Sequence, residues 1–97
     1  MTVFWSPRAR SNLHAIFDYV LSERPAAAVP LVDAIEARVK LLESHPNIGR
    51  PGRIVGTREL VIAGTNYIVV YRTIARPARV EIIAVRHGAR LWPESFD

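Results

Sequence analysis

Three side chains in the second half of the chain could carry acid–base chemistry on a phosphate group. Glu59 could take a proton, His87 could exchange one near neutral pH, and Arg72 could offset negative charge. RNA cleavage without a metal needs such a set, because a base must deprotonate the ribose 2′-hydroxyl, cations must stabilise the phosphorane and an acid must protonate the leaving oxygen. Arg58 and Arg90 are further candidate cations. These residue types keep a metal-independent nuclease among the candidate functions.

His87 also admits a structural interpretation. It ends a strand-like segment, where a histidine can bond the backbone or the C-terminal segment, and we favour this role over proton transfer. His14 and His45 are scattered along the chain and there is no cysteine, so we expect no metal site. The segment 49–52 lacks the glycine spacing and the lysine of a phosphate-binding loop. We therefore expect neither a metal nor a cofactor.

Positive charge is concentrated in the second half of the chain. The formal net charge is +4 and the sequence pI is about 10.3. Residues 1–49 carry five basic and five acidic side chains, whereas residues 50–97 carry eight arginines against four acidic side chains. Arginine offers a planar fork of donors suited to phosphate or carboxylate, so we expect nucleic acid, an acidic protein, or each in turn as the partner. Solubility alone would explain a positive total but not its one-sided placement.

The size and hydropathy of the chain indicate a small folded protein. Its 97 residues predict a single domain spanning residues 1–97, and the hydrophobic fraction of 49% is enough for a core. No apolar run approaches the roughly 20 residues that span a bilayer. The first residues also lack the layout of a signal peptide. We expect a soluble, cytoplasmic protein that does not bind membranes.

The chain begins with a pattern for one strand and one helix. Residues 3–5 are typical of a short strand. Ser6 can then cap a helix whose first residue is Pro7, because proline fits the first helical position. The helix carries one apolar stripe at helical spacing, formed by Leu13, Ile16, Phe17, Val20 and Leu21. Of these, Leu13, Ile16, Phe17 and Val20 are predicted to pack on the sheet beneath the helices.

A second helix is predicted to begin at Pro25 and to run to about Ser44. Pro30 lies beyond its first turn, where proline removes a hydrogen bond and clashes with the preceding turn. We therefore expect either a kink or a helix that begins near Val29. The short link between the helices predicts an antiparallel hairpin. The expected buried face of the second helix comprises Ala28, Leu31 or Val32, Ile35, Val39 and Leu42.

After a loop at residues 45–53 the apolar period becomes strand-like. An N-terminal strand, a helix hairpin and a three-stranded antiparallel meander predict an α+β fold, with the helices on one face of a mostly antiparallel four-stranded sheet. The meander strands are predicted at residues 58–63, 67–74 and 80–85 or 80–87, with turns at 64–66 and 75–78.

The predicted strands are apolar on both faces. Tyr67, Val69 and Tyr71 alternate with Ile68 and Val70, whereas a sheet with one solvated face normally alternates apolar and polar residues. Either a partner covers the second face, or the sheet curves and closes over its own loops and C-terminal segment. The sequence leaves these two alternatives open.

Four segments of the second half occur in an order and spacing typical of one family. They are Pro46-x-x-Gly49-Arg50-x-Gly52-Arg53, Gly56-Thr57-Arg58-Glu59-Leu60, Tyr67-x-Val69-Val70-Tyr71-Arg72 and Val80-Glu81-Ile82-x-x-Val85-x-His87-Gly88-Ala89-Arg90. With the order of elements from Phe4 to Pro93, they make the chain resemble the RelE/ParE toxin superfamily. The resemblance implies the toxin of a bacterial type II toxin–antitoxin pair, neutralised by an acidic antitoxin that is partly disordered when free.

The resemblance implies two alternative mechanisms. RelE-like members cut messenger RNA in the ribosomal A site, whereas ParE-like members lack nuclease residues and poison DNA gyrase. Nuclease members commonly carry an arginine just ahead of the Val-Tyr pair of the central strand, where this chain has Ile68 and Val69. Lys40 is the only lysine, and the C-terminus lacks the usual tyrosine or lysine. The incomplete set favours a ParE-like toxin.

The candidate residues follow from these hypotheses. If the chain is a nuclease, its catalytic residues are expected to be Glu59, Arg72 and His87. A small basic binding module without toxicity is the third hypothesis, which an acidic neighbouring gene for a DNA-binding protein would exclude. The candidate contacts to a target or an antitoxin are Arg50, Arg53, Arg58, Arg86, Arg90 and Trp92.

Overall fold

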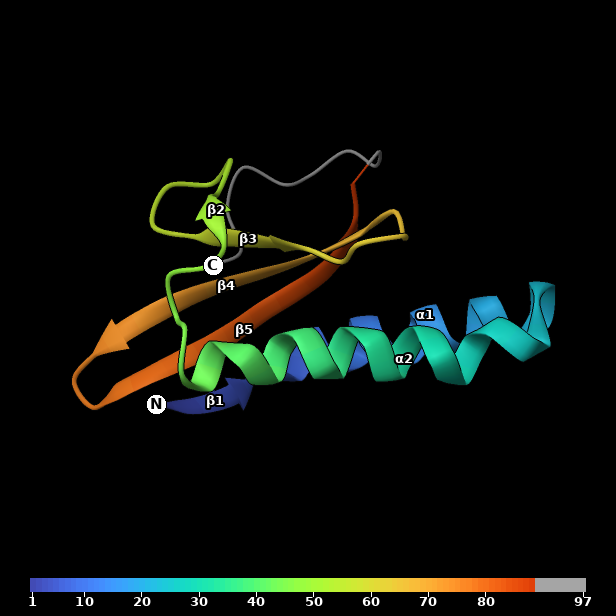
Figure 1. Ribbon diagram of the computed structural model, residues 1–97, viewed down its shortest axis with the longest axis horizontal. Helices are drawn as coiled ribbons and strands as arrows, with labels where there is room; N and C mark the ends of the chain where they lie inside the picture. The colour runs from blue at the N-terminus through green and yellow to red at the C-terminus, as the bar shows by residue number, and fades with distance from the viewer. Residues whose placement is uncertain (89–97) are drawn as a thin grey trace.

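The computed structural model describes residues 1–88 and shows two helices packed on one face of a twisted sheet (Figure 1). The α+β class and the helix hairpin are confirmed. The far end of the hairpin extends past the strands (Figure 1). Within residues 1–88, no helix is long and apolar enough to cross a membrane. In chain order the elements are β1 (Thr2–Trp5), α1 (Pro7–Glu23), α2 (Pro25–Lys40), the 3₁₀-helix η1 (Leu41–Glu43), β2 (Arg50–Pro51), β3 (Arg58–Val61), β4 (Tyr67–Ala75) and β5 (Ala78–His87).

Ser6 is the joint between the first strand and the first helix, and its predicted capping role is confirmed. Its hydroxyl accepts a hydrogen bond from the Ala9 N–H and donates one to the Ile83 carbonyl, while its own N–H donates to the Ile82 carbonyl. Asn12 makes a second link, because its side-chain oxygen accepts from the Val85 N–H. Side chains at the start of α1 thus satisfy the edge of β5 where β1 ends.

The second helix begins at Pro25 as predicted and includes Pro30. The alternative start near Val29 is therefore wrong. Pro30 has no backbone N–H to donate. The helix therefore lacks one hydrogen bond, to a carbonyl of its exposed first turn. The α-helix ends at Lys40, earlier than predicted, and one tighter turn, η1, takes the chain on to Glu43.

The sheet has five strands in the order β1-β5-β4-β3-β2, not the four predicted. β1 pairs parallel to β5, and the other pairs are antiparallel. The additional strand is Arg50–Pro51, which pairs with Arg58 and Glu59 of β3. Its two residues lie between glycines and prolines, so the sequence predicted only a loop there. A bulge between Val70 and Tyr71 bends the central pair of strands.

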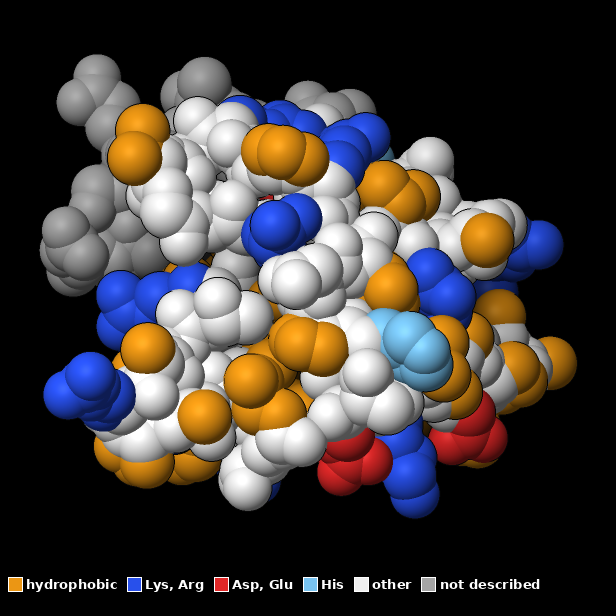
Figure 2. Space-filling view, turned by 60° about the vertical axis from the view of Figure 1, so that its left-hand side comes forward, with side chains coloured by type: hydrophobic (Ala, Val, Ile, Leu, Met, Phe, Trp, Pro, Cys, Tyr) orange, Lys and Arg blue, Asp and Glu red, His pale blue; other side chains and the backbone are white. Residues whose placement is uncertain are grey.

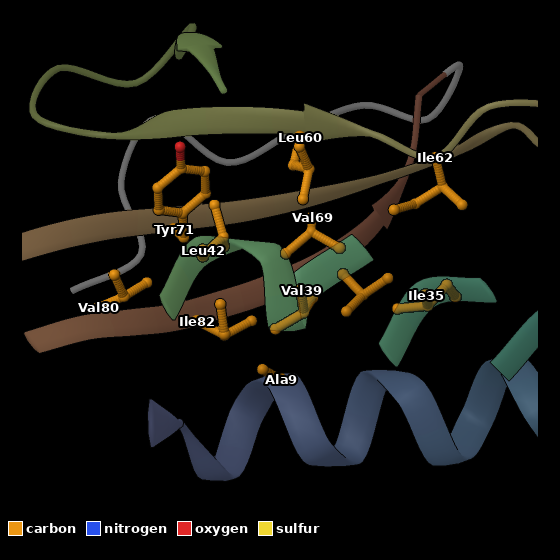
Figure 3. Packing of buried hydrophobic residues seen from close by; sticks show 11 residues of the cluster. Ala9, Ile35, Val39, Leu42, Leu60, Ile62, Val69, Tyr71, Val80 and Ile82 are labelled. Atoms are coloured by element: carbon orange, nitrogen blue, oxygen red, sulfur yellow. The ribbon is translucent and has the colours of Figure 1, made fainter. Parts of the chain in front are cut away.

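The main core lies between the helices and the sheet (Figure 3). Ile35, Val39 and Leu42 are buried as predicted, and Leu13 and Ile16 pack against the same cluster. Phe17 and Val20 are exceptions. Both are only partly buried and neither joins the core cluster, and Phe17 lines a surface hollow between α1 and α2 instead.

The second face of the sheet is closed at its centre. Val70, Ile83 and Ala84 form a separate buried cluster, and strand alternation places Val70 on the face opposite Val69. The chain therefore buries these side chains without a partner. Of the two alternatives left open by the sequence, the burial supports the one in which the protein covers this face itself.

Candidate functional site

A buried carboxylate organises the most basic corner of the molecule. Glu59 lies on β3, and its side chain is 3% exposed. Its Oε1 accepts from Nε and Nη2 of Arg50 at 3.2 and 3.0 Å. Its Oε2 accepts from the backbone N–H and the Nε of Arg53 at 2.8 and 3.2 Å. Both carboxylate oxygens are thus occupied by donors from one short segment.

These contacts decide the charge of Glu59. Burial raises the pKa of its carboxyl, but the backbone hydrogen bond from Arg53 and the side-chain bonds from Arg50 and Arg53 outweigh burial and hold the pKa below its ordinary value of 4.5. A general base must release its own partners to take a proton. Glu59 instead holds segment 50–53 against β3 as an acceptor whose charged form these bonds stabilise.

A second anchor fixes the preceding loop. The buried Tyr71 hydroxyl accepts from the Gly49 N–H at 2.9 Å and donates to the Pro46 carbonyl at 2.8 Å. Burial raises the pKa of Tyr71, with smaller opposite effects from the Gly49 bond and the charge of Arg58. Arg58 donates to the Gly49 carbonyl at 2.8 Å. Gly49 is required here, since a Cβ would lie 2.6 Å from the tyrosine ring and hydroxyl.

The turn between β2 and β3 projects from these anchors. The Gly52 N–H donates to the Thr57 carbonyl at 2.8 Å, and the Thr57 N–H and hydroxyl both donate to the Ile54 carbonyl. Gly56 adopts a φ of 82°, which only glycine reaches without strain. Val55 stands at the tip with its side chain 100% exposed. An internally bonded turn therefore presents one apolar side chain to solvent. We refer to residues 52–57 as the tip.

The three candidate catalytic residues are not brought together. Arg72 shares the second face of the sheet with Glu59 as its diagonal neighbour on β4, but it is paired with Glu81 at 2.9 Å. His87 pairs across the strands with Tyr67, about 16 Å from Arg72 along the sheet at the usual rise per residue. Its ring meets that of Tyr67 edge-on at 5.6 Å. The register places His87 on the helix face, away from the other two.

The candidate contact residues divide in the same way. Arg50, Arg53 and Arg58 gather at the basic corner through the bonds given above, while Arg86 lies at the other end of β5. Arg90 and Trp92 lie outside the described residues. Figure 2 shows basic side chains spread over most of one face, while the clearly visible acidic side chains lie at its lower edge, on either side of a basic one.

Two hollows lie along the first helix. One, of about 280 Å³, is bordered by polar and aromatic side chains that include Tyr19, Tyr67, Arg86 and His87. The other, of about 380 Å³, lies between α1 and α2. Sequence reasoning missed it as a site, although the wide apolar stripe of the first helix was a signal. It is lined by Trp5, Leu13, Phe17 and Val32, with Arg10, His14 and Glu36 at its polar positions. We call it the hairpin hollow.

Known proteins match this chain over most of its length. Residues 3–92 match the family model of the ParE toxin of the type II toxin–antitoxin system parDE. The chain therefore belongs to the ParE toxin family. It is 43% identical to Y4kP of Sinorhizobium fredii, over 93% of this chain and 91% of the relative. It is 32% identical to the toxin RelE3 of Caulobacter vibrioides, over 84% and 88% of the two chains.

Solved structures agree on the fold. The chain is similar to a structure from the chromosomal ParDE toxin–antitoxin system of P. aeruginosa, with a TM-score of 0.80, 24% identity and coverage of 90% of this chain and 95% of the other. It is also similar to a chain of the toxin–antitoxin complex RelBE2 of Mycobacterium tuberculosis, with a TM-score of 0.66, 27% identity and coverage of 89% and 95%. The protein is thus a type II toxin with the RelE/ParE fold.

Proposed function

We propose that this toxin arrests growth by binding DNA gyrase rather than by cutting messenger RNA. The observation that carries the proposal is the separation of its acid–base residues. Glu59 is buried between two arginines, Arg72 is paired with Glu81, and His87 lies on the opposite face of the sheet. General acid–base cleavage needs these groups within hydrogen-bond reach of one phosphate.

The alternative is a ribosome-dependent endonuclease, and one observation favours keeping it. The relatives named RelE2 and RelE3 are 33% and 32% identical to this chain. His87 borders a surface hollow with Tyr19 and Tyr67, which places a candidate proton carrier at the surface. If cleavage occurs, His87 is the residue able to shuttle a proton near neutral pH.

We further propose that an acidic antitoxin neutralises the toxin and lies partly in the hairpin hollow. The hollow is concave and mainly apolar, and Arg10 and His14 stand at its border. An amphipathic segment that folds on binding can fill such a groove with apolar anchors while its carboxylates meet the basic residues. Poor yield without a co-expressed antitoxin, and a stable complex with it, are the expected results. Harmless high-level expression of the chain alone in a susceptible host would contradict the toxin proposal.

The two mechanisms differ in what accumulates in arrested cells. Under the gyrase proposal, induction of the toxin should produce DNA breaks and leave messages intact. Purified toxin should inhibit supercoiling by gyrase. His87→Gln should change either effect only as far as it weakens folding or docking.

The nuclease alternative makes the opposite prediction for the same variant. Message cut at ribosomes by the wild type should fall by about 10²-fold or more in His87→Gln, the usual scale for losing a general acid or base. If ribosome-bound message is cut by the wild type but not by His87→Gln, the gyrase proposal is wrong and the toxin is a ribosome-dependent endonuclease.

A further inference from the structure

The most exposed apolar side chain among residues 1–88 lies in one of the most firmly held turns. Val55 is 100% exposed, whereas the next most exposed large apolar residues, Tyr19 and Val29, are 59% and 58% exposed on the helices. A single exposed valine is ordinary on a protein surface. An exposed valine that the chain holds in one fixed position by many polar contacts is a different feature.

Hydrogen bonds close the tip and fix its base on β3. Three hydrogen bonds close the turn on Thr57 and the Ile54 carbonyl. Below it, Glu59 fixes Arg53 through both its backbone N–H and its side chain, and fixes Arg50 through its guanidinium. Burying a carboxylate is costly unless such bonds compensate it. The buried Glu59 has no catalytic role in the proposed function, but its bonds hold the base of the turn that carries Val55.

The surroundings of the tip carry positive charge. The side chains of Arg50 and Arg53 remain 54% and 41% exposed although both contact Glu59. Arg58 stands at the base of the same turn. Among residues 1–88, the charges around this apolar point are one carboxylate, Glu59, and three arginines, so positive charge is in excess there. The complementary surface is an apolar pocket with carboxylates at its border.

The shape of the tip decides which kind of partner fits it. A flexible segment that folds on binding needs a concave groove, and the hairpin hollow supplies one on α1 and α2. The tip projects, carries a fully exposed Val55 and is closed by its own hydrogen bonds, so it suits a preformed pocket in a folded protein. We propose that Val55 is the anchor by which the toxin enters an acidic, apolar pocket of its folded target. This inference rests on the proposed function, in which binding of a protein target arrests growth.

The substitution Val55→Ser tests the anchor, because a fully exposed side chain contributes little to folding and the variant should remain as stable as the wild type. Its affinity for purified gyrase should fall at least about tenfold, and growth arrest should weaken accordingly, as for an interface anchor. Its affinity for the antitoxin should be unchanged. The matched control is Val61→Ser, which removes another exposed valine, 44% exposed, at the other end of β3 and should leave target affinity unchanged.

The outcomes separate the anchor from the identity of the target. Arrest by Val55→Ser as strong as by the wild type, or equal losses in both valine variants, would overturn the anchor. Loss of antitoxin affinity with arrest intact would also overturn it. If wild-type toxin does not bind gyrase but Val55→Ser still abolishes arrest, the gyrase proposal fails and the anchor stands.

Discussion

The helix hairpin and the basic corner differ in both shape and chemistry. The hairpin leaves part of its apolar stripe uncovered, so Phe17 and Val32 line a hollow at the surface. The corner at β2 and β3 instead buries a carboxylate, whose hydrogen bonds hold the base of a projecting turn. The first region is a mainly apolar hollow, and the second is a projecting turn closed by its own hydrogen bonds. We infer that the two regions serve different partners.

The largest expected effect lies in the core that both regions share. Ile35→Ala should lower the free energy of unfolding by about 2–5 kcal/mol, because the side chain is fully buried between α2 and the sheet. Chemical denaturation with unchanged denaturant dependence would measure it. A loss below about 1 kcal/mol would mean that the hairpin does not pack on the sheet as described.

The next effect tests the basic corner. Glu59→Gln removes the charge that four donors share, and it should cost about 2 kcal/mol, the scale of hydrogen bonds to a charged group. The matched control is Glu81→Gln, which breaks the more exposed pair with Arg72 and should cost at most about 0.5 kcal/mol. Equal costs would contradict a special role for Glu59.

The pH dependence of the same pair of proteins provides an independent check. The pKa of Glu59 is lowered in the folded state, so its charged form stabilises the fold. That contribution is complete above the unfolded pKa and is lost as the pH falls through the folded pKa. The stability difference between the wild type and Glu59→Gln should therefore be constant near neutral pH and shrink below about pH 4.5. A difference that grows on acidification would contradict the lowered pKa.

The hairpin hollow should contribute less to stability than the fully buried core does. Truncating a fully buried phenylalanine to alanine lowers the free energy of unfolding by about 3–5 kcal/mol. Because the ring of Phe17 is only half-buried at a surface hollow, we expect Phe17→Ala to cost roughly half of that or less. Thermal unfolding measures the change. A loss within the full range would show that the hollow is closed in solution.

The sequence predicted the parts of the fold that depend on local signals. Ser6-Pro7 marked the first helix, and the alternation around Val69 marked the central strand. It missed the short strand at Arg50–Pro51, because two residues between glycines and prolines have no period and pair only through β3. It also placed Phe17 in the core, since helical spacing shows which face is apolar but not whether each residue on it meets the sheet or the second helix.

The candidate site was harder to predict than the fold. Glu59, Arg72 and His87 have suitable chemistry, but reactivity depends on partners and on strand register. Composition could not show that Arg50 and Arg53 both converge on Glu59. The one-sided arginine excess was informative about binding, and its clearest expression is the corner around the tip. A sequence reveals which groups are available, whereas their pairing decides what they do.

One crossed measurement tests the separation of the two regions most directly. The affinity for the antitoxin and the strength of growth arrest would both be measured for Phe17→Ala and Val55→Ser. We predict that Phe17→Ala weakens antitoxin binding and leaves arrest intact, while Val55→Ser weakens arrest and leaves antitoxin binding intact. Two variants that each lose both properties, or that lose the same one, would contradict the account.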